Sequence, residues 1–336
     1  MMSNIQQQFD VAVVVPTMLR HTLTQCIESI FNQTINGRVQ ILIGIDKEIG
    51  DRAQLDFFQK KCPNNMSITL MDLGYSTSAR HGGIYSNFYG GAIRTILSYA
   101  ANSPYVAYLD DDDWWRVDHL ETMLNAVSGN DWAFSYRWFV DKDTNWLISK
   151  DEWDSVGPGR GINNDRFGGF VGPSSLILAK SACHLVFPYW SLAPFKDGSG
   201  EDRLIFRELM KLNKYSSTGE HTCFCIMDQS VEKHIHHREE FQKRNIDWIY
   251  DRSLIDEIMY LEDDLKKNFN NLSSSVINNT KRLLSLNGNS LTGLTLAVKI
   301  SELSGRAADR DIFRRQIYDI TGCRSVSDLQ SQITIS

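Results

Sequence analysis

A run of four aspartates directly after a buried strand constrains the fold of this chain more than any other feature. The run, Asp110 to Asp113, lies inside the segment "YVAYLDDDDWW". The apolar stretch Tyr105 to Leu109 is typical of a strand covered on both faces, and charges at its end are costly unless a cation or a solvated cleft compensates them. Carboxylate oxygens suit Mg²⁺ and Mn²⁺, and Mg²⁺ often binds protein carboxylates together with substrate phosphates. The run therefore predicts a metal and diphosphate site, with a solvated acidic loop capping the next helix as the alternative.

The composition excludes several classes of protein. A chain of 336 residues is long enough for one large domain and an appendage. With 41 acidic and 35 basic side chains, its net charge of −6 gives no basic field for a nucleic acid. No apolar run approaches the roughly 20 residues of a membrane span, and "MMSNIQQQFD" lacks the parts of a signal peptide. We therefore expect a cytoplasmic protein with no nucleic-acid partner and no membrane span.

The first third of the chain alternates between strand and helix patterns. Strands are predicted at 11–15, 39–45, 68–73 and 105–109, and helices at 23–31, 55–58, 91–101 and 116–127. Such alternation predicts an α/β fold with a mostly parallel, twisted sheet flanked by helices, in which ligands bind at the carboxyl ends of the strands. Pro16, Asp46 and Asp110 all follow predicted strands.

The rest of the chain is less regular. The predictions are a strand at 132–140 with a hairpin partner at 145–148, a substrate loop at 155–172, helices at 174–185 and 202–212, and a strand at 222–227. Beyond Ile246 a stripe of apolar residues at helical spacing is followed by a linker at 268–280 and two or three further helices. This tail is interpreted as a packing or oligomerisation appendage, so a homo-oligomer is one expectation.

Four landmarks in order resemble the family 2 glycosyltransferases, which have the GT-A fold. They are "VAVVVPTMLRHTLTQCIESIFNQT", the Gly91, Ala92 and Arg94 element, "YLDDDDWW", and "GSGEDRLIFREL", which is similar to the family's Glu-Asp motif. The resemblance covers about residues 10–240. It implies a catalytic domain at 1–245, with nucleotide-sugar binding in about 10–115 and the acceptor side and catalytic base in about 130–245, followed by a helical extension at 246–336.

The resemblance assigns roles to the acidic residues. Asp112 would bind the metal, while Asp110 and Asp111 would face the donor ribose or the water shell of the metal. Asp202 would be the base that takes the proton of the acceptor hydroxyl, and Glu201 would orient it or bind an acceptor hydroxyl. Without the other landmarks, Glu201 and Asp202 would read as ordinary first-turn acids stabilised by the helix dipole.

Donor recognition is expected at the ends of the strands. The resemblance places Pro16, Thr17, Arg20 and Asp46 around the nucleobase and ribose, and Arg94 near the ribose or diphosphate. The chain departs from the family after its second strand, where it reads "IDKEIGD" instead of Asp-Asp-Gly-Ser. The identity of the base is therefore open.

Two further groups of candidates come from the second half of the chain. A histidine in "EKHIHHRE", either His234 or His236, would reach the metal or the diphosphate, since neutral imidazole can serve as a ligand. Trp115 and Trp153 are candidates for stacking on a sugar, and the backbone at Gly172 for close approach to it. The alternative is that the tryptophans are core residues.

These inferences converge on a metal-dependent, inverting glycosyltransferase that uses Mn²⁺ or Mg²⁺. It would move a sugar from a nucleotide-diphosphate sugar donor to a hydroxyl of a saccharide or glycoconjugate acceptor. The Gln-x-x-Arg-Trp motif of processive members is absent, so one sugar per encounter is expected. The alternatives are a nucleotidyltransferase on a similar sheet and a catalytically inactive sugar-nucleotide-binding protein.

Overall fold

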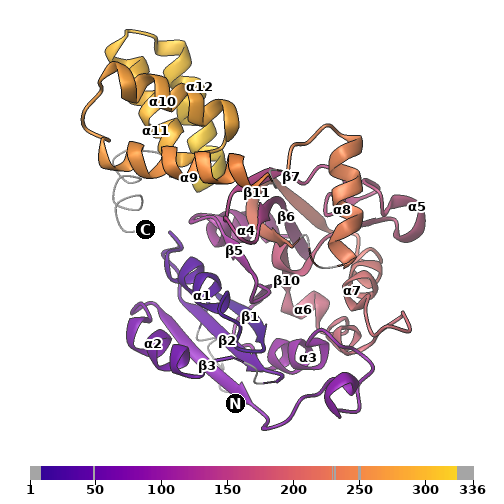
Figure 1. Ribbon diagram of the computed structural model, residues 1–336. Coiled ribbons are helices and arrows are strands. Elements are labelled where there is room, and N and C mark those ends of the chain that lie inside the picture. Colours follow the sequence, from indigo (N-terminus) through magenta and orange to yellow (C-terminus); the bar gives the residue numbers. More distant parts are fainter. Residues whose placement is uncertain (1–8, 48–49, 229, 231, 249–250, 324–336) are drawn as a thin grey trace. The chain divides into compact units, whose positions relative to one another are not determined.

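The computed structural model describes residues 9–47, 50–228, 230, 232–248 and 251–323 (Figure 1). The chain divides into two compact units. Unit 1 comprises Met1–Arg137 and Lys150–Cys225, and unit 2 comprises Trp138–Ser149 and Ile226–Ser336. All of the predicted site residues except the two histidines belong to unit 1.

A nine-stranded sheet is built on four parallel strands in the order β3-β2-β1-β4. These strands are β1 (Val11–Thr17), β2 (Val39–Ile45), β3 (Met66–Asp72) and β4 (Tyr105–Tyr108). Beyond β4 the order continues through β10 (Leu176–Ala179), β6 (Trp132–Asp141), β11 (Tyr215–Met227) and β5 (Asp113–Trp115), while β7 (Leu147–Lys150) pairs with β6. Strand β10 is antiparallel to both of its neighbours. The four parallel strands form the nucleotide-binding type of half-sheet that the sequence predicts.

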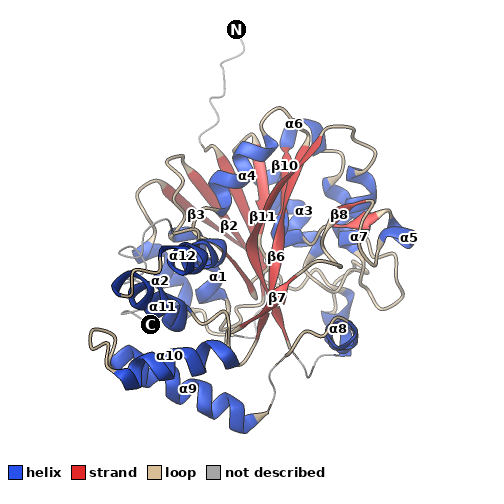
Figure 2. Cartoon of the chain, turned by 90° about the horizontal axis from the view of Figure 1, so that it is seen from above, coloured by secondary structure: helices blue, strands red, loops and turns tan. Residues whose placement is uncertain are grey.

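Helices cover both faces of this sheet (Figure 2). One core joins alternate residues of β1, Val11, Val13 and Val15, to helices α1 (Leu23–Phe31), α2 (Ala53–Lys61) and α4 (His119–Val127). The other core joins Ala12 and Val14 to α3 (Gly91–Ala100), α6 (Lys180–Cys183) and α7 (Glu201–Leu209). A strand whose side chains are buried alternately on both faces explains why its sequence is an unbroken apolar run. The α/β prediction is confirmed.

Short elements complete unit 1. They are the helices α5 (Asn164–Phe167), η1 (Ala79–His81), η2 (Pro173–Ser175) and η3 (Phe187–Ser191), and the two-stranded sheet β8 (Gly157–Pro158) and β9 (Gly169–Phe170). The predicted helix at 174–185 is wrong in its first half, because Leu176–Ala179 forms β10 in the middle of the sheet. A short apolar run has no period that separates a buried strand from a buried helix, and here the pairing partner decides.

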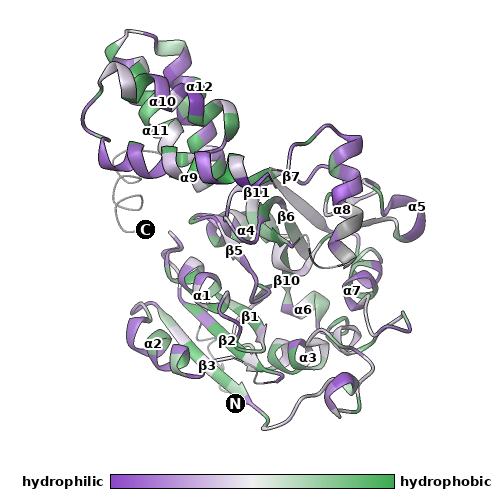
Figure 3. Ribbon diagram, viewed as in Figure 1, coloured by the Kyte–Doolittle hydropathy of each residue, from purple (hydrophilic) through white to green (hydrophobic). Residues whose placement is uncertain are grey.

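Unit 2 contains the helical C-terminal region that the sequence predicts. Its helices are α8 (Glu232–Lys243), α9 (Arg252–Lys267), α10 (Ser274–Leu286), α11 (Leu291–Leu303) and α12 (Ala307–Thr321). Helices α9, α10 and α11 share an apolar core that includes the predicted stripe residues Ile258, Leu261 and Leu265, whereas α8 is mostly hydrophilic in Figure 3. The predicted linker at 268–280 is shorter than expected, because Ser273 caps α10 by accepting a hydrogen bond from the N–H of Val276. Within the described ranges, no helix is long and apolar enough to cross a membrane.

Candidate active site

The site begins where the strand order reverses. β1 and β4 are neighbours, while β2 and β3 lie on the other side of β1, so the crevice at the carboxyl ends of β1 and β4 is the expected ligand position. Thr17 ends β1, and its hydroxyl donates a 2.7 Å hydrogen bond to Oδ2 of Asp111 just beyond β4. Burial raises the pKa of Asp111 to about 6. The structure therefore brings Thr17 and Asp111 together, as the predicted donor site requires.

Asp112 is more exposed to solvent than Asp110, Asp111 or Asp113. Its side chain is 42% exposed, and its Oδ2 lies 2.7 Å from Nη1 of Arg20, which also lies 3.3 Å from Asp111. In the part of the chain that the structure describes, no group of three or more His, Cys, Asp and Glu side chains is arranged to hold a metal ion. A cation here would thus need ligands from a bound substrate in addition to the aspartates.

The last aspartate of the run is tied to the protein by a serine. Ser174 accepts a 3.1 Å hydrogen bond from the backbone N–H of Asp110 and donates one of 2.5 Å to Oδ2 of Asp113. Burial, with the neighbouring Asp112 and Asp110, raises the pKa of Asp113 to about 8. Asp113 therefore holds the loop in place as a neutral acid at pH 7. Sequence reasoning gave Ser174 no role, since it lay in the predicted helix.

Arg94 joins the aspartate run to the second acidic pair. It is 4% exposed, and its guanidinium pairs with Asp110 through Nη2 while Nη1 lies 3.5 Å from Oε1 of Glu201. Nη1 also donates a 2.8 Å hydrogen bond to the carbonyl of Tyr89. Burial and the nearby Asp202 raise the pKa of Glu201 to about 8, so this acid is protonated at pH 7. Residues from β4, α3 and α7 thus meet around one buried guanidinium.

Asp202 lies in the first turn of α7 and is 20% exposed at its side chain. Its two carboxylate oxygens lie 2.9 and 2.8 Å from Nη1 of Arg203, whose guanidinium stacks over the ring of Phe170 at 4.4 Å. The helix begins after Gly200, whose φ of 91° favours glycine. Arg203 is a site residue that the sequence did not indicate, because a contact between adjacent side chains leaves no pattern of spacing.

Asp46 holds a loop instead of presenting a free carboxylate. It is 5% exposed, and its oxygens accept hydrogen bonds from the N–H and hydroxyl of Thr77 at 2.9 and 2.5 Å and from the hydroxyl of Ser76 at 3.1 Å. Pro16 is buried in β1, and a Cβ at Gly90 would lie 3.2 Å from its ring. Asp46 therefore binds protein groups in this structure, and its contact with the base or ribose stays a prediction.

Residues 85–183 match the family described as Glycosyl transferase family 2. The predicted resemblance to this family is confirmed over these residues. The matched segment includes Arg94, the aspartate run and Ser174, and it ends before Glu201 and Asp202. The glycosyltransferase class of this family agrees with the predicted enzyme class.

Solved structures similar to this chain include Staphylococcus aureus TarS and its fragment 1–349. TarS is 14% identical, with 95% of this chain and 55% of TarS covered and a TM-score of 0.47. The fragment with UDP-GlcNAc is 13% identical, with 97% and 86% covered and a TM-score of 0.48. The fragment with UDP is 12% identical, with 96% and 91% covered and a TM-score of 0.46. This chain therefore spans little more than half the length of TarS, and no curated protein matches it.

The three acceptor candidates, Trp115, Trp153 and Gly172, are buried, and their contact with a sugar stays a prediction. Trp115 is 3% exposed, donates a 2.7 Å hydrogen bond to the carbonyl of Ser174 and stacks on His119. Trp153 is 2% exposed. A Cβ at Gly172 would lie 3.0 Å from a nitrogen of the Arg137 guanidinium, so its small size serves protein packing.

The two candidate histidines belong to unit 2. Nδ1 of His234 accepts a 2.9 Å hydrogen bond from the N–H of Asp228, which fixes that ring nitrogen as an acceptor. The side chain of His236 lies outside the described residues. The contact of either histidine with a metal or diphosphate stays a prediction.

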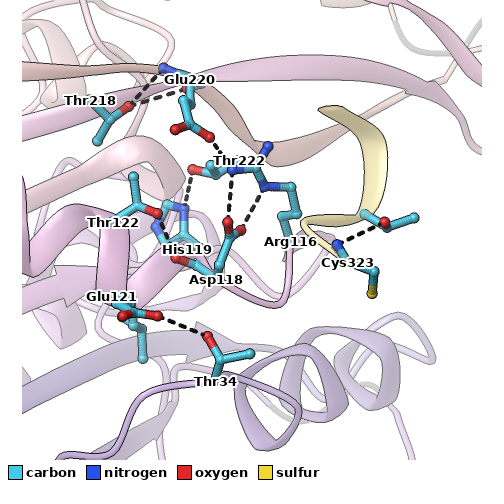
Figure 4. A network of polar contacts seen from close by, with 12 residues as sticks. Thr34, Arg116, Asp118, His119, Glu121, Thr122, Thr218, Glu220, Thr222 and Cys323 are labelled. Carbon is cyan, nitrogen blue, oxygen red and sulfur yellow. Dashed lines mark hydrogen bonds and ion pairs between the residues drawn. The ribbon is translucent and has the colours of Figure 1, made fainter. Parts of the chain in front are cut away.

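A second polar network supports the aspartate run from the far end of β5 (Figure 4). Arg116 lies 2.6 Å from Asp118 and also pairs with Glu220, while Nδ1 of His119 lies 2.7 Å from the hydroxyl of Thr222. Burial lowers the pKa of His119 to about 3, so the ring is neutral. These contacts attach α4 to β11 and hold the end of β5, the strand that begins at Asp113.

Proposed function

We propose that this chain is a metal-dependent, inverting glycosyltransferase that moves one sugar per encounter from a nucleotide-diphosphate donor to a saccharide-type hydroxyl. The observation that carries the proposal is the guanidinium of Arg94, which binds Asp110 after β4 and Glu201 at the start of α7. Arg94 thereby links the acidic run at the topological switch point to Glu201, whose neighbour Asp202 is 20% exposed at its side chain. The proposed donor-binding residues and the proposed catalytic base thus belong to one site.

The residues present fit a divalent cation. The donor atoms are carboxylate oxygens, which Mg²⁺ and Mn²⁺ prefer, and Asp112 is the exposed one. Asp112 would hold the ion together with phosphate oxygens of the donor and water. Such an ion acts as a Lewis acid that stabilises the negative charge of the leaving diphosphate.

The chain's own groups supply the rest. Asp202 takes the proton of the acceptor hydroxyl as its oxygen attacks the anomeric carbon from the face opposite the diphosphate, which inverts that centre. Glu201 is neutral at pH 7, so it adds no second charge beside the base. Arg94 and Arg20 compensate the charge of the aspartates.

The substitution Asp202→Asn tests the proposal. It keeps the shape of the side chain and removes the base, so we expect transfer to fall by about 10²- to 10⁴-fold, the usual contribution of general base catalysis. Binding of the donor nucleotide should be retained. A thermal-shift panel of UDP, GDP, dTDP and CDP with Mn²⁺ first finds the base, and transfer from the matching sugar nucleotides is then followed by release of nucleoside diphosphate.

Asp165→Asn is the matched control, because Asp165 is an exposed first-turn acid of another unit 1 helix, α5. If Asp202→Asn transfers sugar as fast as this control, Asp202 is not the base. Wild-type protein that binds a nucleotide but transfers no sugar would favour the inactive binding protein.

A further inference from the structure

The turn that leads into the Glu201–Asp202 pair depends on glycine. Gly198 has a φ of 77° and Gly200 a φ of 91°, both in the left-handed region. Within the turn, the N–H and hydroxyl of Ser199 donate hydrogen bonds to Asp197 at 3.0 and 2.6 Å. Since α7 begins directly after Gly200, the position of this turn sets the position of the two acids.

A separate loop, residues 76–90, holds this turn from outside. The backbone N–H of Phe88 donates a 3.0 Å hydrogen bond to the carbonyl of Gly198. The ring of Phe88 lies against the same glycine, because a Cβ built there would stand 2.5 Å from its Cγ. A backbone bond and a ring contact from Phe88 therefore hold Gly198 against the loop, and the carbonyl of Ser86 also lies close to it.

The Phe88 ring also contacts a charged residue. The guanidinium of Arg80 lies 4.6 Å from the centroid of Phe88, within the range of a cation–π contact. The positive charge of Arg80 also reaches the turn, where it adds to the hydrogen bonds from Ser199 that lower the pKa of Asp197.

The same loop is attached to the donor side of the site at both of its ends. Ser76 and Thr77 bind the carboxylate of Asp46 after β2. At the other end, Asn87 accepts hydrogen bonds from Tyr89 and Gly91 at the start of α3, and the carbonyl of Tyr89 holds Arg94. The loop thus spans from the end of β2 to the helix that carries Arg94, with Phe88 contacting the turn before α7.

We propose that Phe88 is a positioning residue for Asp202, acting through its contact with Gly198. The proposal rests on the proposed function, in which Asp202 is the base. A small displacement of α7 moves the base relative to the anomeric carbon, whereas the donor contacts at β1 and β4 are unaffected. Loss of the ring should therefore lower kcat and leave the KM for the donor nearly unchanged.

The first test compares Phe88→Ala with Phe88→Tyr and with Ile84→Ala, a control in the same loop whose side chain is 89% exposed. We expect kcat of Phe88→Ala to fall by about 10- to 100-fold, as misplacement of a catalytic group by about 1 Å can cost. Phe88→Tyr keeps the ring and should restore kcat, and Ile84→Ala should match wild type. If Phe88→Ala equals Ile84→Ala in kcat, or loses only donor affinity, the proposal is wrong.

A double-mutant cycle with Gly198→Ala tests the contact itself and does not depend on the stability of one variant. The added Cβ meets the Phe88 ring in the wild-type background, so Gly198→Ala should cost more kcat there than in the Phe88→Ala background. Equal losses in both backgrounds would overturn the proposal. An active Asp202→Asn would instead refute the proposed function, and it would do so whatever the cycle shows.

Discussion

Two buried arginines in unit 1 differ in how well their carboxylates are satisfied. Arg137 lies 2.7 Å from Asp151, whose side chain is 0% exposed, and also pairs with Asp154. Although burial opposes ionisation, Arg137 and the N–H groups of Asp154 and Ser155 hold the pKa of Asp151 below its usual value. This cluster fixes the turn at 151–155, and its charges are matched by protein groups.

Arg94 occupies the opposite kind of environment. Asp110, which it binds, is 27% exposed, and Glu201 has a pKa of about 8. The site as a whole contains six carboxyl groups, 110–113, 201 and 202, and three arginines, 20, 94 and 203. Burial, together with the neighbouring carboxyl groups, raises the pKa of Asp111, Asp113 and Glu201, whereas the pKa of Asp151 in the Arg137 cluster is lowered. Raised carboxyl pKa values therefore distinguish the candidate active site from the structural ion cluster at Arg137.

The two arginines should respond oppositely to the same substitution. Arg137→Met leaves two buried carboxylates without their cation and should lower the free energy of unfolding by about 3–5 kcal/mol. Arg94→Met leaves one carboxylate that water reaches and one that is already neutral, so its loss of stability should be smaller while sugar transfer falls by about 100-fold or more. Urea unfolding and kcat of the folded variants provide the two measurements.

The contrast between the two arginines would fail if Arg94→Met lowered the free energy of unfolding as much as Arg137→Met does while kcat per folded molecule stayed unchanged. Arg94 would then be a structural residue. Arg38→Met, an exposed arginine of the same unit, serves as the control for loss of one positive charge.

The proposed binding of a cation is tested at Asp112. Binding of the preferred nucleoside diphosphate should need Mn²⁺ or Mg²⁺. Asp112→Ala should weaken this binding by about 10- to 100-fold, because removal of even a supporting group of a metal site has an effect of that size. Titration calorimetry with and without EDTA measures this. Asp118→Ala is the comparison, because Asp118 pairs with Arg116 in the other network. Equal affinities with and without metal would contradict the assignment.

The sequence predicts the strands that carry the site but not the contacts that complete it. β1, β2 and β4 are recognisable because strands buried on both faces are continuous apolar runs. Arg94 and Asp202 were found through motifs whose spacing is fixed by the fold. Ser174 was missed because an apolar run after it has no helical or strand period, and its role depends on the pairing of β10 with β4.

Burial was the property that sequence reasoning could not supply. Trp115 and Trp153 have the same ring chemistry in a core as on a sugar-binding surface, and only the tertiary packing decides. Asp46 likewise follows a strand as a donor ligand would, yet its partners, Ser76 and Thr77, lie 30 residues further along the chain. Contacts over such separations leave no local pattern.

The smallest expected effect concerns the neutral acid of the site, Glu201. Its pKa is raised from 4.5 to about 8 in the folded protein, so the proton stabilises the folded state. That contribution is fully present below about pH 4.5 and is lost as the pH rises through about 8, since the unfolded chain gives up the proton first. Glu201→Gln is neutral at every pH. Relative to wild type, the variant should therefore gain stability between pH 5 and pH 9 in urea unfolding experiments.

Glu208→Gln on the same helix provides the control, because its carboxylate lies 3.5 Å from Arg207 and also pairs with Lys211, away from the acidic run. Asp111 and Asp113, whose pKa values are also raised, contribute equally to wild type and both variants and cancel from the difference. A difference between Glu201→Gln and wild type that stays constant across this pH range would mean that Glu201 is ionised throughout. Arg94 would then be satisfied by two full charges, as Arg137 is, and the contrast between the two clusters would disappear.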